Sequence, residues 1–159
     1  MLASLIQRMN TLFASIPHWF IATLARFSIA AVFWKSGQTK VQGFAIDLIE
    51  GRYTFGIPHF SDSAVDLFRD EYKLPVLPPE LAAFLAASAE HIFSALILVG
   101  LATRLSSLAL LGMTLVIEVF VYPDAYPTHG VWAVALLYLI KFGPGPLALD
   151  ALLKKAWGK

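Results

Sequence analysis

Four long apolar segments set the main limits on what this chain can fold into. They run over residues 19–36, 79–101, 105–122 and 129–142. A helix crosses the hydrocarbon core of a bilayer, about 30 Å thick, with about 20 apolar residues, and it satisfies its own backbone hydrogen bonds there. The sequence therefore predicts an all-α fold, a transmembrane four-helix bundle in contact with the lipid bilayer, with residues 1–159 as one domain.

The composition agrees with a membrane protein and excludes several kinds of function. Of the 159 residues, 58% are hydrophobic and 14% are charged, whereas a soluble domain is about 45–50% apolar. The chain has no cysteine, so it forms no disulfide or thiolate metal site, and any redox chemistry must belong to a bound cofactor or a partner. The basic residues form no patch with interleaved aromatic residues, which argues against a nucleic-acid partner.

Residues 2–16 are expected to form an amphipathic helix ahead of the first span. Such a helix lies at the lipid interface or packs against the bundle as a surface helix, and the sequence leaves both open. Its apolar positions, which recur at steps of three and four, are Leu2, Leu5, Ile6, Met9, Leu12, Phe13 and Ile16.

The connection between the first two spans, residues 37–78, is expected to lie outside the cell and to carry a helix. Ser61 is a favourable N-cap residue for a helix over Asp62–Lys73, and Pro75 ends it. Basic residues gather on the opposite side of the membrane, which places both termini in the cytoplasm by the positive-inside rule. These basic residues are Arg8, Arg104, Lys154, Lys155 and Lys159.

Ionisable residues inside the apolar segments are costly in a bilayer and are functional candidates for that reason. Arg26 and Lys40 share one helical stripe, and Glu90 and His91 lie in the second segment. A rise of about 1.5 Å per residue places Glu90 near the midplane and Arg26 slightly toward the cytoplasm, which predicts an ion pair between them. The pair either fixes helix register, or it binds a small ligand such as a quinone or relays protons.

A second group of polar residues is expected near the external end of the bundle. Glu118 lies about one turn from the end of the third segment, and His129 begins the fourth at the same level, so the two should meet. With Lys40, His59 and His91 they would line a cavity suited to proton transfer or weak metal binding. The alternatives are a solvated His129 and a helix-packing hydrogen bond for His91. No HxxxH or HxxE spacing occurs, so no metal is predicted.

Short motifs occur through the chain in an order that is more specific than any one of them. They are Arg26, Gly37 and Lys40, then Gly56–Pro58, Glu90, Gly100–Arg104, and Gly143–Asp150. With these motifs the chain resembles the DoxX family over most of its length after residue 20. The resemblance implies a small four-helix bundle in a bacterial or archaeal inner membrane, often encoded with redox partners.

The resemblance also bears on function. One branch of the family resembles the membrane subunit of a thiosulfate:quinone oxidoreductase, and other members accompany thiol-stress or metal-peptide systems. The recurrent polar positions of the family match Arg26, Lys40, Glu90 and Arg104, and the family has no agreed catalytic assignment for them.

Three functions follow as hypotheses. The first is the inner-membrane component of a redox system, at most the membrane subunit of an oxidoreductase, with a quinone or similar apolar ligand near Arg26 and Glu90. The second is a non-catalytic anchor whose external helix docks a partner protein. The third is a transporter of a small solute or metal that uses Glu118 and His129. A homo-oligomer is compatible with each of them.

Overall fold

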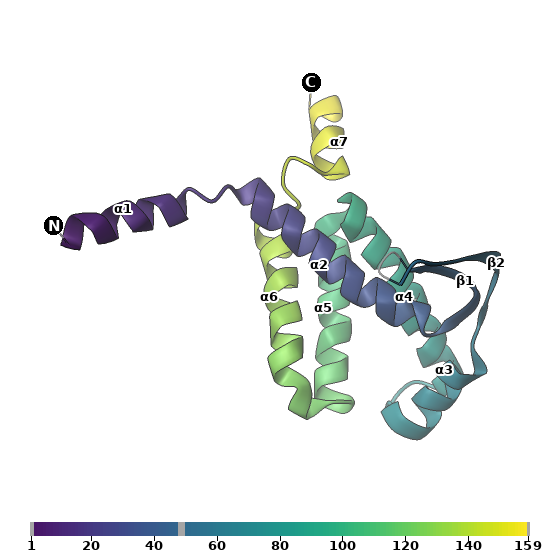
Figure 1. Ribbon diagram of the computed structural model, residues 1–159. Coiled ribbons are helices and arrows are strands. Elements are labelled where there is room, and N and C mark those ends of the chain that lie inside the picture. The colour runs from purple at the N-terminus through teal and green to yellow at the C-terminus, as the bar shows by residue number, and fades with distance from the viewer. Residues whose placement is uncertain (1, 48–49, 159) are drawn as a thin grey trace.

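The computed structural model describes residues 2–47 and 50–158, so Lys159 of the basic group lies outside the described part. Helices predominate, as the sequence predicts, and two strands form a small hairpin (Figure 1). The elements are α1 (Leu2–Ala14), α2 (His18–Gln38), β1 (Val41–Asp47), β2 (Arg52–Phe60), α3 (Asp62–Leu67), the π-helix η1 (Phe68–Tyr72), α4 (Pro79–Val99), α5 (Thr103–Phe120), the 3-10 helix η2 (Pro123–Ala125), α6 (Tyr126–Phe142) and α7 (Leu149–Trp157).

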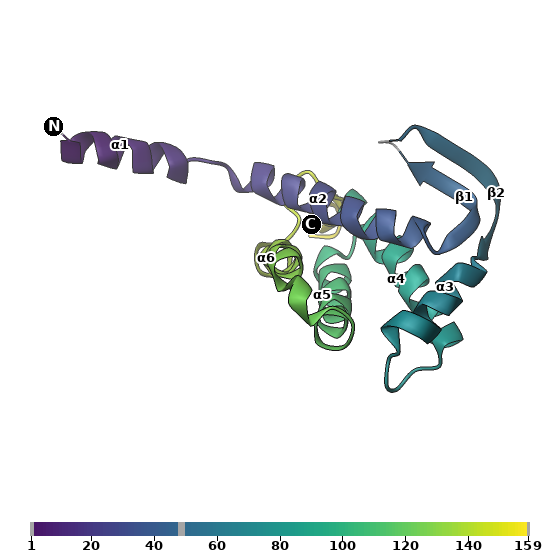
Figure 2. The same cartoon turned by 60° about the horizontal axis from the view of Figure 1, so that its bottom comes forward.

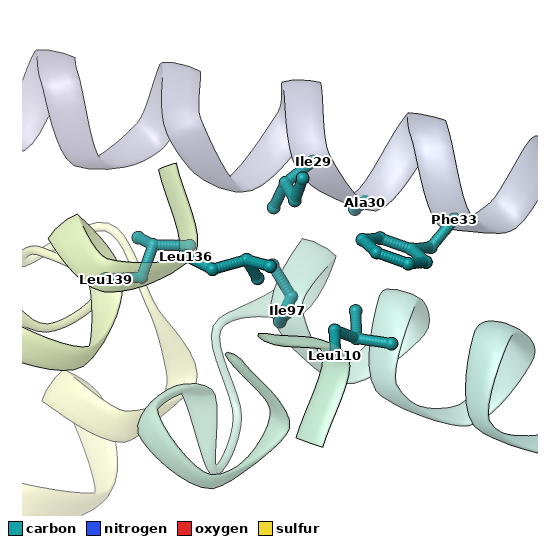
Figure 3. Close-up of a cluster of buried hydrophobic side chains, with 7 residues drawn as sticks. All are labelled: Ile29, Ala30, Phe33, Ile97, Leu110, Leu136 and Leu139. Atoms are coloured by element: carbon teal, nitrogen blue, oxygen red, sulfur yellow. The ribbon is translucent and has the colours of Figure 1, made fainter. Parts of the chain in front are cut away.

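Helices α2, α4, α5 and α6 form the bundle. α5 and α6 run antiparallel side by side, and α2 lies obliquely across the bundle (Figures 1 and 2). Each of the four helices contributes to one buried apolar core (Figure 3). Large apolar side chains also cover the outside, for example Leu105 and Leu115 on α5, which suits contact with lipid tails. The core side chains are Ile29, Ala30, Phe33, Ile97, Leu110, Leu136 and Leu139.

Two of the predicted spans correspond to helices that are long and apolar enough to cross a bilayer on their own. These are α4 and α5, with 21 and 18 residues. α1 and α2 meet the same condition as a pair, although they bend by 57° at their junction. The described residues thus contain two candidate spans, or three with the bent pair. The α6 helix has 17 residues, and the count of four spans stays a prediction.

Helix α1 extends away from the bundle (Figures 1 and 2). None of its residues is buried, and apolar side chains such as Leu2 and Leu12 remain largely exposed. Of the two alternatives, packing against the bundle is therefore wrong. Its position at the lipid interface stays a prediction.

The connection after α2 contains an antiparallel hairpin, so the all-α prediction is wrong for this segment. The register runs from Val41 opposite Phe60 to Asp47 opposite Arg52. Two side chains of α2 hold the first strand at Ile46. Trp34 Nε1 donates to the carbonyl of Ile46 (2.9 Å), and the N–H of Ile46 donates to Gln38 Oε1 (2.8 Å). These anchors lie outside the strand sequence itself, and β-structure depends strongly on such context.

The predicted external helix is present in two parts. α3 begins at Asp62, η1 continues it, and the helix ends at Lys73, which has a left-handed φ of 43°. Ser61 stands at the N-cap position, but its side chain does not cap the helix. Its hydroxyl instead contacts Ser63 Oγ at 2.5 Å and accepts a hydrogen bond from Gln42.

Helices α2 and α4 approach closely at Gly37. A Cβ atom at this position would lie 2.8 Å from Cε1 and Nδ1 of His91 and 3.1 Å from Cβ of Glu90. These distances are shorter than ordinary van der Waals contacts, so a glycine lets the two helices cross here. The crossing places the end of α2 against Glu90.

We expect Gly37→Ala to destabilise the protein by about 1–3 kcal/mol, because the added methyl group pushes α4 away or displaces the His91 ring. Gly112→Ala is the matched control, since a Cβ atom there meets nothing within 4 Å. Thermal unfolding in one detergent, followed by circular dichroism, measures the difference. A wild-type melting temperature for Gly37→Ala would show that the fold does not depend on this crossing.

Candidate functional site

The buried guanidinium of Arg26 binds backbone carbonyls, so the predicted ion pair with Glu90 is wrong. Its Nε donates to the carbonyl of Ile97 (3.0 Å) and its Nη2 to that of Leu98 (2.6 Å). Its Nη1 donates to the carbonyls of Leu147 (2.6 Å) and Pro144 (3.3 Å). The last carbonyls of a helix lack partners and carry partial negative charge. Arg26 therefore neutralises the end of α4 and ties it to the segment before α7.

Asp150 completes the same end of the bundle. Its carboxylate accepts hydrogen bonds from the N–H groups of Ala102 (2.8 Å) and Thr103 (3.0 Å), where α5 begins. Its own N–H donates to the carbonyl of Gly100 (2.8 Å). Gly100 has a φ of 73°, and a Cβ atom there would lie 2.5 Å from that of Ala148. We call Arg26, Gly100, Ala102, Thr103 and Asp150 the Arg26 clasp.

The partner of Glu90 is Lys40. Lys40 Nζ lies 2.9 Å from Oε2 and 3.0 Å from Oε1 of Glu90, and both side chains are buried. Ser36 Oγ donates to the same carboxylate (2.8 Å), and Lys40 also donates to the carbonyl of Ser36 (3.2 Å). The crossing at Gly37 explains this choice, because it sets residues 36 and 40 against the middle of α4. Lys40, Glu90 and Ser36 form a buried polar site, here called the Lys40–Glu90 site.

His91 packs beside this site. Its Nδ1 lies 2.8 Å from the carbonyl of Ala87, which is an acceptor, so Nδ1 carries the proton. Its Nε2 then accepts from Gln38 Nε2 (2.8 Å), and the Trp34 ring meets the imidazole edge to face at 5.1 Å between centroids. The helix-packing interpretation of His91 is therefore confirmed. The imidazole links α4 to α2 and, through Gln38, to β1.

The predicted contact between Glu118 and His129 is confirmed. His129 Nδ1 lies 2.6 Å from Glu118 Oε2, and its ring packs against Trp132. His59 is exposed on β2, and its Nδ1 lies 3.3 Å from the carbonyl oxygen of Ile57. Among residues 2–47 and 50–158, no three His, Asp or Glu side chains form a group that could hold a metal ion.

Two tyrosines that the sequence analysis did not single out join η1 to the end of α5. The Tyr122 hydroxyl donates to the carboxylate of Glu71, and the Tyr72 and Tyr122 rings meet edge to face at 5.7 Å. Burial raises the pKa of Tyr72 above its ordinary value of 10.0. The Tyr72 hydroxyl thus stays protonated at neutral pH.

A largely apolar groove of about 420 Å³ lies between α2 and α4, with β1 at one end. The α2 side is a helical stripe that includes two small residues, Ala30 and Ala31, and the α4 side includes Ser94 and Ala95. Gln38 and Lys35 supply the polar atoms near β1. The small residues on both helices were the sequence signal for a groove. The signal was insufficient, because the position of the groove depends on how the two helices cross. Its other lining residues are Phe27, Trp34, Ile46, Asp47, Leu98 and Val99.

One of the comparisons with known proteins identifies the family. The sequence model of the DoxX family matches residues 21–123, which run from α2 into η2. The chain belongs to the DoxX family. With its apolar helices, this DoxX protein is an integral membrane protein that crosses the bilayer more than once. The comparison with curated proteins found no match, and neither did the comparison with solved structures.

We expect Arg26→Met to destabilise this DoxX protein by about 3 kcal/mol or more, because four carbonyl oxygens lose their charged donor. Arg26→Lys should recover only part of the loss, since an ammonium group cannot present the planar fork of a guanidinium. Unfolding midpoints in detergent provide the measurement, and Arg8→Met on the exposed α1 is the control. If Arg26→Met unfolds like the control, the clasp does not stabilise the fold.

A double-mutant cycle tests the Lys40–Glu90 site. Lys40→Met leaves a buried carboxylate without its cation, which should cost about 3–5 kcal/mol. Adding Glu90→Gln removes that charge, so the double variant should be more stable than the sum of the single effects predicts, by about 1 kcal/mol or more. The exposed pair Arg52–Glu50, 2.9 Å apart, is the control cycle and should couple by less than about 1 kcal/mol. Additive effects at Lys40 and Glu90 would contradict the pairing.

Proposed function

We propose that this DoxX protein is the membrane component of a redox system and that it holds a quinone, or a similar flat apolar ring, in the groove between α2 and α4. The groove supports this most directly, since binding sites for such ligands are concave, mostly apolar and supplied with a few polar groups. The chain has no cysteine, so electrons would pass between the ligand and a partner protein. The protein is then at most the membrane subunit of an oxidoreductase.

The groove residues fit a ring with carbonyl groups. Alanine side chains on both helices leave space for a flat body, and Gln38 Nε2 has a second hydrogen besides the one directed at His91. Lys35 also lines the groove, and its ammonium group lies 3.5 Å from Glu50 Oε1. Phe27 and Leu98 line the groove and are exposed on the outer face of the bundle, so an apolar ligand would enter from the bilayer. A bound quinone would supply two-electron, two-proton chemistry.

The Lys40–Glu90 site would support this ligand from the neighbouring layer of the protein. Ser94 lines the groove, and its hydroxyl donates to the backbone carbonyl of Glu90. Gln38 also lines the groove, and His91 fixes its amide. Lys40 and Glu90 form a buried ion pair, and in this proposal the pair would serve as a proton reserve for the ligand. Arg26 takes no part, because backbone carbonyls occupy its donors.

The proposed setting is a cell inner membrane with four spans, α2, α4, α5 and α6, and both termini in the cytoplasm. The cations Arg104, Lys154 and Lys155 lie at the end of the bundle that carries α7, which suits a cytoplasmic position. The hairpin, α3 and η1 would then face outward, where a protein partner can reach them.

A non-catalytic anchor is the second candidate function. It is favoured by the structural use of Arg26 and by the exposed acids Asp66, Asp70 and Glu71 on α3 and η1, which would dock a basic surface of a soluble partner. In that case the buried charges hold the fold and the groove binds ordinary lipid.

Filling the groove tests the proposal. Ala95→Phe should remove quinone from protein purified natively in mild detergent, because the ring occupies the ligand volume, and liquid chromatography with mass spectrometry measures the content. Val116→Phe, on the exposed face of α5, is the control and should keep the wild-type content. If wild type and both variants carry no stoichiometric quinone but retain the same partner protein, the anchor function replaces the redox proposal.

A further inference from the structure

A second cavity, of about 550 Å³, lies at the end of the bundle where α5 begins and α7 crosses it. It is separate from the α2–α4 groove and shares no lining residue with it. Its charged lining residues are the cations Arg104 and Lys154 and one acid, Asp150, and His18 and Thr103 add further polar groups. The cavity thus joins two side-chain cations to the start of a long helix.

The charges of this cavity are unbalanced. Asp150 directs both carboxylate oxygens at the N–H groups of Ala102 and Thr103. Among the described residues, no carboxylate forms an ion pair with Arg104 or Lys154. Within residues 2–47 and 50–158, the one hydrogen bond that Arg104 donates is to the carbonyl of Lys141, at 3.4 Å. Its guanidinium therefore keeps most of its donors for a ligand.

Thr103 contributes to the cavity from the first turn of α5. The side chain of Thr103 is fully buried and lines the cavity, and its Oγ1 has no hydrogen-bond partner within the described part of the chain. A buried polar atom without a partner is destabilising. This oxygen is inaccessible to a group in the cavity, so a ligand there would be held by the side-chain cations and not by the Thr103 hydroxyl.

We infer that this cavity binds a phosphate group at the membrane surface, supplied by the headgroup of an anionic phospholipid. Arginine and lysine bind phosphate through charge-assisted hydrogen bonds, and basic pockets between membrane helices bind anionic headgroups. The rim of the cavity suits the rest of a lipid, because Leu105 is 72% exposed and Phe142 is 52% exposed. A soluble phosphate ester shares the headgroup chemistry but would make no use of this apolar rim.

The test uses the full chain in detergent after removal of lipid, titrated with phosphatidylglycerol, phosphatidylcholine or inorganic phosphate and followed by native mass spectrometry. We expect one phosphatidylglycerol per chain, weaker binding of phosphatidylcholine, and binding about tenfold or more weaker in Arg104→Gln/Lys154→Gln. Arg52→Gln/Lys73→Gln removes the same charge at the hairpin end and should bind like wild type. Circular dichroism checks that each variant is folded.

Two results would overturn the inference. One is equal affinity of wild type and Arg104→Gln/Lys154→Gln for phosphatidylglycerol, and the other is equal affinity of wild type for the two lipids. Inorganic phosphate that binds wild type but not the double variant, without any retained lipid, would keep the phosphate site and assign it to a soluble ester. Quinone content does not enter this readout, so the site and the redox proposal are tested separately.

Discussion

A buried charge in a membrane protein must find its partner inside the protein, and the Arg26 guanidinium does so by binding the carbonyls that end α4. This interaction brings together sequence motifs that are far apart in the chain, around Arg26, Gly100 and Asp150. The break at Gly100 turns the chain from α4 into α5, and Asp150 supplies the carboxylate that starts α5. The clasp thus fixes one end of the bundle and leaves the crossing at Gly37 to fix the other.

Much of the helical fold could be predicted from the sequence, because lipid imposes length and apolarity on each span. The hairpin could not, since its first strand depends on hydrogen bonds from Trp34 and Gln38 on another element. The apolar residues of the hairpin sequence give no indication of those contacts. The helix predicted over Asp62–Lys73, in contrast, is present at that place as α3 and η1, although Ser61 does not cap it.

The candidate site was only partly predictable for a related reason. The residues Arg26, Lys40 and Glu90 could be selected because charges in apolar segments are rare, but their pairing depends on the helix crossing. Depth alone placed Arg26 near Glu90, whereas α2 lies obliquely and carries Lys40 to that carboxylate instead. Glu118 and His129 could be paired correctly, because α5 and α6 are antiparallel neighbours joined by a short turn. The depth of two side chains in the membrane therefore predicts their pairing well when their helices are antiparallel neighbours, and poorly when one helix crosses the other obliquely.

The clasp also has a consequence for biosynthesis. Two of the carbonyls that bind Arg26 and the carboxylate that caps α5 come from residues 144–150, which follow all four bundle helices in the chain. While these residues are still in the ribosome, Arg26 has only the α4 carbonyls, and the first N–H groups of α5 have no cap. The bundle can therefore close at this end only after residues 144–150 have been synthesised, so a segment made after all four bundle helices is the one that locks α2 to α4.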